Sequence, residues 1–301
     1  MRLGIFSRSM VDGTIDDVVA EVRAAQEQGF ASFWASQIFS HDALTVLAVA
    51  GREVPGIELG TSVVPTYPRH PTALAQQALS TNAACDGRLC LGIGLSHQIV
   101  IEGMFGLSFD KPVRHLREYL AVLLPLLRGE AADFDGETLR VHATMSVRGA
   151  GAPSVAVAAL GPQMLRLAGS MTDGTITWCV GPNTLRDLTV PALRAAAEEA
   201  ARPSPRVIAA LPVCVTTDAA AARERASTVF AIYGQLPSYR AMMDREGVAG
   251  PADLAIVGSA AEVQDRIGAL SDIGVTDFVA AEFGASSDER DETRAALQSL
   301  L

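Results

Sequence analysis

The sequence predicts a single α/β domain over residues 1–301, folded as a (β/α)8 (TIM) barrel. Strand-like and helix-like segments alternate along the whole chain, which predicts a parallel sheet. Eight strand candidates occur, and no G-x-G-x-x-G motif opens a helix after the first, as it would in many open, doubly wound sheets. Hydrophobic residues make up 49% of the chain but aromatic residues only 5%. This composition suits parallel strands that are buried on both faces.

One local pattern repeats at several predicted strands: a helix ends at a glycine, and a β-branched or apolar run follows. Gly29 precedes SFWA, Gly87 precedes LCLGIG, Gly174 precedes TITW and Gly274 precedes VTDFVAA. The predicted strands are residues 2–6, 32–35, 57–61, 89–94, 154–159, 174–178, 207–215 and 276–281. The predicted helices are about 14–28, 43–52, 72–84, 112–128, 162–170, 183–200, 218–234 and 260–272, with a last one from about 287.

Three stretches are longer than a simple barrel needs, and they predict insertions. Residues 95–111 follow the fourth strand and, being apolar and glycine-bearing, could cover the barrel mouth. Residues 129–153 precede the fifth strand and contain FDGETLRVH, which predicts a hairpin turning at Asp135-Gly136. Residues 235–258 follow the seventh strand.

Composition and charge narrow the possible partners and the compartment. The formal net charge is −10, which argues against a general nucleic-acid or anionic-membrane surface. We find neither a signal-peptide pattern nor an apolar run of roughly 18 residues, so we expect a cytoplasmic protein. The four cysteines form no C-x-x-C pair, which favours reduced, buried thiols over a metal site.

Catalytic residues of a (β/α)8 barrel follow the carboxyl ends of its strands. In this chain those positions hold few acids or bases: Ser7-Arg8, Ser36-Gln37, Ser62-Val63, Leu95-Ser96-His97, Leu160-Gly161, Cys179-Val180 and Glu282-Phe283. Neither a metal-ligand spacing nor a G-x-S-x-G nucleophile motif occurs. Such a site suits a cofactor that carries the chemistry itself.

Two of these positions suggest specific roles. The turn Ala159-Leu160-Gly161-Pro162-Gln163 joins a strand to a helix, where backbone N–H groups and the helix dipole favour a phosphate. An ordinary strand-to-helix turn is the alternative. His97 is the only histidine placed directly after a strand, so it could donate a proton or a hydrogen bond to a reactant. The alternative is a loop histidine without a chemical role.

Four segments together resemble a known family. In order along residues 2–200 they are QGFASFWASQIF, IELGTSVVPTYPRHPTALAQQA, GRLCLGIGLSHQ and VAVAALGPQMLRLAGSMTDGTITW. They resemble the luciferase-like monooxygenase superfamily, and specifically its deazaflavin (F420)-dependent actinobacterial branch. The resemblance implies a bacterial-luciferase-like barrel, a homodimer, and a cofactor ring in the barrel mouth with its phosphate toward strands five and six.

The resemblance also implies roles for particular residues. In the deazaflavin members a non-proline cis peptide lies behind the ring, and the matching bond here is Ser62–Val63. Leu95, Ser96 and His97 match the turn that contacts the ring. The phosphate turn matches Ala159, Leu160, Gly161 and Pro162, and Gln163 follows it directly.

The chain departs from the relatives that oxidise sugar phosphates. Those relatives have Asp-His where this chain has Gln37-Ile38, and an acid at the position of His97, so their substrate and mechanism do not carry over. Gln37 could still hydrogen-bond the ring. The apolar residues Phe39, Met104, Phe105 and Trp178 favour an uncharged or hydrophobic substrate, although Trp178 could equally be a core residue.

The resulting hypothesis is an F420-dependent oxidoreductase without a metal. It would transfer a hydride between the deazaflavin ring and a C=O, C=N or C=C bond of a small molecule, with His97 as the proton partner. A deazaflavin lacks the ring nitrogen through which flavins react readily with oxygen, so reductase or dehydrogenase chemistry is favoured over oxygenation. One alternative is an FMN-dependent monooxygenase of the same fold. Another is a non-catalytic F420-binding protein.

Overall fold

The computed structural model describes residues 1–301. Contacts within the chain group these residues into two compact units. Unit 1 consists of Met1–Arg8, Ala24–Trp34 and Ala159–Leu301. Unit 2 consists of Ser9–Arg23 and Ala35–Ala158.

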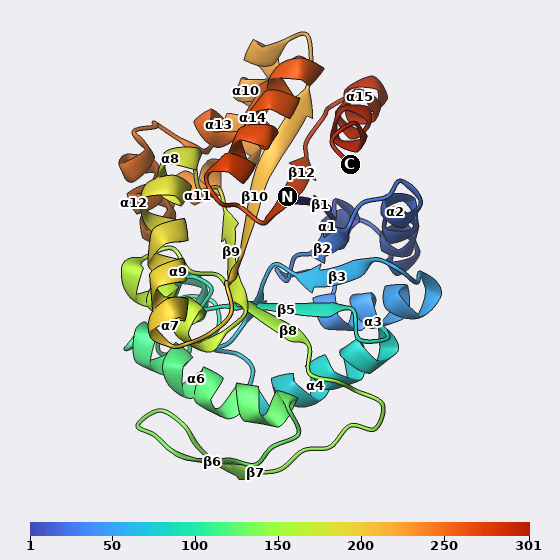
Figure 1. The fold of residues 1–301 in the computed structure, drawn as a ribbon. Helices are drawn as coiled ribbons and strands as arrows, with labels where there is room; N and C mark the ends of the chain where they lie inside the picture. The colour runs from blue at the N-terminus through green and yellow to red at the C-terminus, as the bar shows by residue number, and fades with distance from the viewer. The chain divides into compact units, whose positions relative to one another are not determined.

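Unit 1 contains parallel strands in the order β9–β10–β12–β1–β2. The long strands β10 and β12 lie side by side in Figure 1. A short strand pairs with the carboxyl end of β10, where the sequence predicted only an irregular extension. The bounds are β1 (Arg2–Phe6), β2 (Ser32–Ala35), β9 (Gly174–Trp178), β10 (Arg206–Val215), β11 (Ile256–Gly258) and β12 (Asp277–Glu282).

The register of these strands shows which side chains share a face. Trp178 pairs with Ala210, Ala210 with Val279, and Val279 with Gly4. Paired residues of parallel strands point to the same side of a sheet, so these four residues lie in one row on one face. Only glycine fits at position 4, because a Cβ there would lie 2.3 Å from the Ser32 hydroxyl oxygen.

The helices of unit 1 follow its strands, as predicted, with two breaks. The predicted helix 183–200 contains a π-helical turn, η1, directly before Pro191, which has no N–H to continue the α-helical bonding. The predicted helix 218–234 is interrupted at Phe230. The bounds are α7 (Pro162–Met171), α8 (Pro182–Thr184), η1 (Leu185–Thr189), α9 (Val190–Glu199), α10 (Ala219–Val229), α11 (Ala231–Gln235), α12 (Pro237–Glu246), α13 (Pro251–Leu254), α14 (Ala260–Asp272) and α15 (Ser287–Gln298).

Unit 2 contains the parallel strands β3–β5–β8, with the short β4 also paired to β5. The predicted hairpin is confirmed: β6 and β7 are antiparallel, and β6 ends at Asp135. Strand β8 ends at Val157, two residues before its predicted end. The bounds are β3 (Glu58–Thr61), β4 (Val64–Pro65), β5 (Leu89–Gly94), β6 (Ala132–Asp135), β7 (Arg140–Ala143) and β8 (Ser154–Val157). The helices of the amino-terminal half are α1 (Ser9–Asp12), α2 (Ile15–Glu27), α3 (Ala43–Glu53), α4 (Pro71–Ala84), α5 (Gln98–Ile101) and α6 (Pro112–Leu127).

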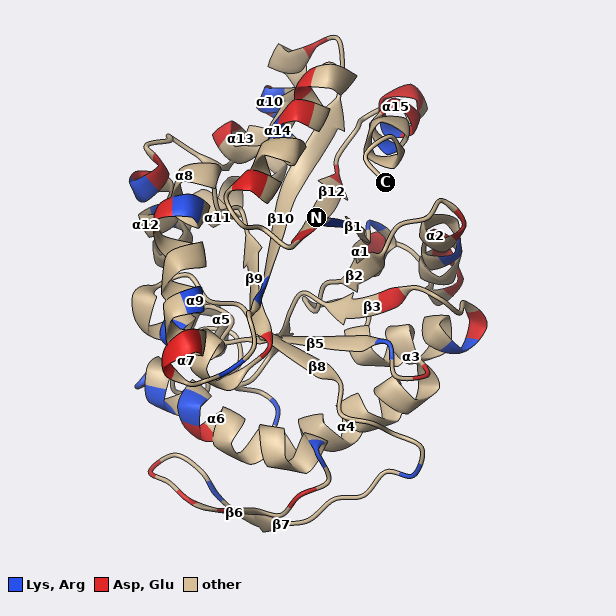
Figure 2. Cartoon of the chain, in the orientation of Figure 1, with Lys and Arg blue, Asp and Glu red and all other residues tan.

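The strand order of the whole sheet is that of a closed barrel. It runs β10–β12–β1–β2–β3–β5–β8–β9 and returns to β10, which confirms the predicted (β/α)8 class. The predicted insertions hold α5 after the fourth strand, the β6–β7 hairpin before the fifth, and α12, α13 and β11 after the seventh. Most charged residues lie on helices and loops (Figure 2). None of the helices combines the length and apolar character needed to cross a membrane.

Candidate functional site

In unit 2 the predicted ring-contacting residues after β3 and β5 lie close together. The Ser62–Val63 peptide bond is cis, as the resemblance implied. The Ser62 N–H donates to the Ala35 carbonyl oxygen at the end of β2 (2.8 Å). A Cβ on Gly94 would lie 2.7 Å from Val63 Cγ2, so the glycine at the end of β5 allows the cis segment to pack against this strand. The ends of three strands therefore meet within this unit.

Two further predicted residues have defined conformations beside these strand ends. The Gln37 side-chain oxygen accepts a hydrogen bond from the Ala43 N–H (2.7 Å), which leaves the Gln37 amide N–H groups as donors for another acceptor. Ser96 has a φ of 60°, a left-handed conformation that non-glycine residues rarely adopt and that clusters at functional sites. Leu95, Ser96 and His97 are all half-buried.

His97 begins the short helix α5, and its carbonyl oxygen accepts hydrogen bonds from the N–H groups of Val100 and Ile101. Burial lowers the pKa of His97, because a charged imidazolium loses hydration there. The ring is therefore neutral at pH 7. It can donate or accept a hydrogen bond in that state, and it gains a proton to release only at lower pH.

The three predicted substrate residues of unit 2 lie on exposed loops. Phe39 and Phe105 are in edge-to-face contact with their ring centroids 6.2 Å apart, so residues from the loops after the second and fourth strands meet. Phe39, Met104 and Phe105 are 60%, 60% and 40% exposed, and Ile38 and Leu107 add further exposed apolar surface. An exposed apolar patch of this kind is typical of a binding surface.

His115, at a position without a recognisable sequence motif, organises the segment after β3. Its ring stacks on Tyr67 with centroids 3.9 Å apart and planes 5° apart, and its Nε2 lies 3.0 Å from the Thr66 hydroxyl oxygen. Burial lowers the pKa of His115 to about 4. Forty-nine residues separate His115 from Thr66. No local sequence pattern could have revealed this contact.

We expect His115 to make the folded protein less stable in mild acid. Its pKa is about 4 when folded and 6.5 in the unfolded reference, so unfolding takes up a proton between these values. The stability contributed by the neutral ring is complete above pH 6.5 and is lost as the pH falls toward 4. The loss should be about 1 to 2 kcal/mol, after allowance for partial exposure. Thermal unfolding across this range should show a smaller pH dependence in His115→Gln than in the parent; equal slopes would contradict the assignment.

In unit 1 the predicted phosphate turn has an uncapped helix start. Gly161 is the N-cap residue of the ten-residue helix α7, and no side chain accepts hydrogen bonds from the first turn of this helix. A Cβ on Gly161 would meet no atom within 4 Å. Ala159 is buried, whereas Pro162 and Gln163 are exposed. The start of α7 is therefore uncapped and has space beside Gly161, two features that an anion-binding turn requires.

A second strand–Gly–Pro–helix turn of unit 1, at Gly181, differs in this respect. The Glu246 carboxylate at the end of α12 accepts hydrogen bonds from the N–H groups of Asn183 (3.0 Å) and Thr184 (2.8 Å). A Cβ on Gly181 would lie only 2.3 Å from the Glu246 carboxyl carbon. The chain thus places its own anion at the start of α8 and none at the start of α7.

Trp178, the fourth predicted substrate residue, ends β9 and is half-buried. Its ring contacts that of Phe6, the last residue of β1, at 5.7 Å between centroids. The sequence did not indicate this partner, since the two residues are far apart in the chain.

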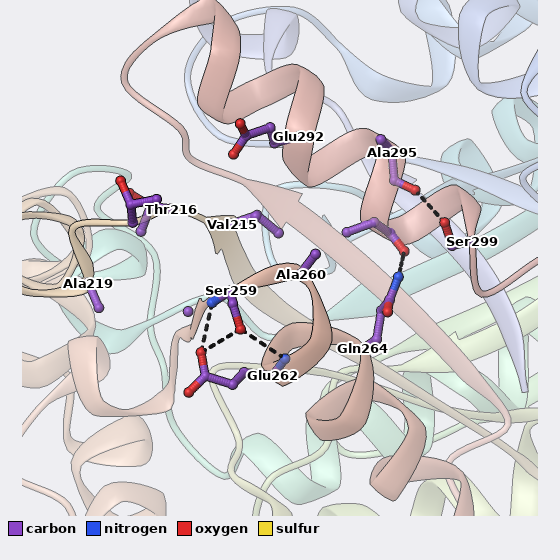
Figure 3. Close-up of a pocket in the computed structure, with 13 residues that line it drawn as sticks. Val215, Thr216, Ala219, Ser259, Ala260, Glu262, Gln264, Glu292, Ala295 and Ser299 are labelled. Atoms are coloured by element: carbon purple, nitrogen blue, oxygen red, sulfur yellow. Dashed lines mark hydrogen bonds between the residues drawn. The ribbon is translucent and has the colours of Figure 1, made fainter.

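A separate cavity of about 680 Å³ lies in unit 1 between α14, α15 and the end of β10 (Figure 3). Several of its polar groups already have partners within the chain. The Ser259 N–H and hydroxyl both donate to Glu262 (2.8 Å each), and the Gln264 amide donates to the Ala296 carbonyl oxygen (3.1 Å). This arrangement caps α14 and joins it to α15, and it suggests no chemistry.

Comparison with known proteins identifies the family. The model of the luciferase-like monooxygenase family matches residues 1–277. The chain belongs to this family. One relative, the 5,10-methylenetetrahydromethanopterin reductase of Methanolobus tindarius, is 28% identical over 281 residues, which cover 93% of this chain and 85% of the relative.

Two solved structures of similar fold extend over nearly the whole chain. The coenzyme F420-dependent tetrahydromethanopterin reductase of Methanopyrus kandleri superposes with a TM-score of 0.82 at 20% identity, covering 99% of this chain and 96% of that one. An F420-dependent secondary alcohol dehydrogenase in complex with an F420-acetone adduct gives a TM-score of 0.81 at 18% identity, covering 100% and 99%. At these identities the likeness establishes the fold, here that of luciferase-like (β/α)8 barrels.

Proposed function

We propose that this luciferase-like protein is a coenzyme F420-dependent oxidoreductase. It transfers a hydride between the deazaflavin and a small, uncharged or hydrophobic molecule with a C=O, C=N or C=C bond. Family membership supports the proposal, as do a reductase relative and two structural neighbours described as F420-dependent. The proposal includes a homodimer, which the resemblance implies, and a cytoplasmic location.

The observation that carries the proposal is the open turn at Gly161. A phosphodiester needs backbone N–H donors and space for its oxygens, and the first turn of α7 offers both. At the comparable turn at Gly181 the Glu246 carboxylate already accepts hydrogen bonds from the backbone N–H groups. Only the turn at Gly161 therefore keeps its N–H groups for an external anion. We therefore assign the cofactor phosphate to this turn, which consists of Ala159, Leu160, Gly161, Pro162 and Gln163.

We assign the planar deazaflavin ring to the residues of unit 2 that follow β2, β3 and β5. The cis segment Ser62–Val63 presents peptide backbone at the end of β3, and Leu95 and Ser96 follow the neighbouring strand β5. Gln37 has amide donors available for a ring carbonyl or ring nitrogen. Together these residues would position the ring, and position is the main contribution that a protein makes to cofactor-borne chemistry.

When bound, the reduced deazaflavin supplies a hydride to the substrate carbon. Reduction of a carbonyl also needs one proton on the oxygen, and we assign its delivery to His97. Its burial lowers the pKa, so the imidazolium is a stronger acid than a free histidine and releases its proton readily. Phe39, Met104 and Phe105 would exclude water and hold apolar parts of the substrate.

Titration of the purified protein with F420 and with FMN, followed by cofactor fluorescence, tests this function. We expect tighter binding of F420, and oxidation of reduced F420 in the presence of an uncharged carbonyl compound but not a sugar phosphate. Tighter binding of FMN would replace the proposal with an FMN-dependent monooxygenase. Binding of F420 without its consumption by any acceptor would indicate a non-catalytic F420-binding protein.

A further inference from the structure

An aromatic cluster gathers in unit 1 around the end of the sixth strand. Three of its members stand at carboxyl ends of strands, where active-site residues of barrels lie. The other three come from the segment that follows β10. The aromatic cluster consists of Phe6, Trp178, Phe283, Phe230, Tyr233 and Tyr239.

The register of unit 1 shows that Trp178 and Phe6 face the inside of the sheet. Trp178 shares a row with Gly4 through β10 and β12, and Phe6 lies two residues beyond Gly4 on the same face of β1. Strands β9 and β1 are separated by β10 and β12, yet the two rings touch at 5.7 Å. Side chains of strands that far apart can meet only across the concave face of a curved sheet.

The segment that follows β10, here residues 230–246, covers this indole. Phe230 and Tyr233 both meet Trp178 edge-on, with centroids 5.7 Å away, and Tyr239 meets Tyr233 at 5.2 Å. Glu246, at the end of this segment, accepts hydrogen bonds from the start of α8 just beyond Trp178. The segment is thus tied to the residues that follow the sixth strand.

The cluster combines partial exposure with an unsatisfied donor. Phe6, Trp178, Tyr233 and Phe283 are only half-buried, and the last three pack against a buried cluster that includes Phe230. The Trp178 Nε1–H is itself buried and has no hydrogen-bond partner. A buried donor without a partner is costly, so an acceptor brought by a ligand would be favoured here.

The Tyr233 hydroxyl is a second donor beside this indole. Burial raises the pKa of Tyr233 to about 12, and its ring meets that of Trp178 edge-on with centroids 5.7 Å apart. Tyr233 therefore stays protonated at neutral pH. The cluster itself contains no charged side chain, and the nearby Arg225 is engaged by Glu289 (3.0 Å) and by the Phe283 carbonyl oxygen (3.2 Å).

We propose that the aromatic cluster binds the substrate, and that the substrate is a planar aromatic ketone or aldehyde. Its ring packs against Phe6, Trp178 and Phe283, and its carbonyl oxygen accepts hydrogen bonds from the Trp178 N–H and the Tyr233 hydroxyl. A carbonyl oxygen has two lone pairs, which matches two convergent donors. This inference rests on the proposed function and specifies the substrate class of that reaction.

Ligand binding without turnover tests the inference. Acetophenone, cyclohexyl methyl ketone and ethylbenzene are titrated by calorimetry into the protein loaded with oxidised F420, and again without cofactor. We expect acetophenone to bind about tenfold more tightly than the other two, because only it combines a flat ring with an acceptor. In the cofactor-free protein its binding should also quench the fluorescence of Trp178, since the other tryptophan, Trp34, is fully buried.

Two substitutions separate a binding role from a structural one. Trp178→Phe and Tyr233→Phe each remove one donor and keep an aromatic ring, and each should weaken acetophenone binding about tenfold with ethylbenzene binding unchanged. Tyr67→Phe is the matched control, because it removes a buried, unpartnered hydroxyl of unit 2 that lies outside the cluster. It should leave ketone binding at the parental level.

The outcomes distinguish this inference from the proposed function. Equal affinity for acetophenone and cyclohexyl methyl ketone, or unchanged ketone affinity in folded Trp178→Phe and Tyr233→Phe proteins, would overturn the inference even if F420 binds and is consumed. Failure of F420 to bind would overturn the proposed function. The cofactor-free titration would still decide whether the cluster recognises an aromatic carbonyl.

Discussion

Replacing Gly161 with Asp is expected to lower the affinity for F420 by about 100-fold while the fold stays as stable as before. The backbone at Gly161 has a φ of −85° and a ψ of 161°, which any residue can adopt, and a Cβ there meets no atom within 4 Å. An aspartate at an N-cap position accepts hydrogen bonds from the first N–H groups of the helix. It would occupy the donors proposed for the cofactor phosphate and repel the phosphate charge at close range, an effect of about 2.7 kcal/mol for a 100-fold loss.

The matched control is Gly161→Asn, which has the same size and caps the helix without a charge. Fluorescence titration should rank the proteins parent, Asn variant and Asp variant in order of decreasing F420 affinity, and thermal unfolding should show that none is destabilised. Parental affinity in a folded Asp variant would place the phosphate elsewhere.

Replacing His97 with Ala should lower the rate of carbonyl reduction roughly tenfold to a thousandfold, the range expected for loss of a general acid. The imidazolium can deliver its proton only below its own pKa, which burial lowers. In the reductive direction the parental rate should therefore fall as the pH rises through that value. In the oxidative direction neutral His97 accepts the proton, so the rate should rise with pH.

The full pH profile of turnover is the measurement that checks this role. His97→Ala should lose the pH dependence in both directions while F420 affinity changes little. His97→Gln retains a hydrogen-bond donor but cannot titrate in this range, so it should also give a flat profile. An unchanged rate and profile in His97→Ala would remove His97 from the proton transfer.

Local signals predicted most of the barrel. Glycines at helix ends and apolar runs placed β2, β5 and β9 at their observed bounds, and an apolar run alone placed β1. Each of these strands is largely buried along its own length, so the signal is local. The predictions were less accurate where backbone hydrogen bonding depends on other elements of the fold. Strand β11 has three residues and exists because β10 extends far enough to pair with it. The π-helical turn η1 was also missed.

Some residues of the candidate site were also predictable from the sequence, and others were not. Position after a strand identified His97, Gly161 and Trp178, and the resemblance identified the cis bond Ser62–Val63. Tertiary contacts alone revealed that Glu246 closes the turn at Gly181. The stacking of His115 on Tyr67 likewise joins residues with no common sequence pattern.

The sequence by itself determined the alternation of strands and helices, the location of the insertions and the scarcity of acids and bases at the strand ends. These features depend on residues close together in the chain, through burial periodicity and turn chemistry. The tertiary structure decided which of two similar Gly-Pro turns stays open and which aromatic rings surround Trp178. Both depend on side chains from the segment that follows β10, among them Glu246, Phe230 and Tyr233, whose positions are set by packing between distant segments.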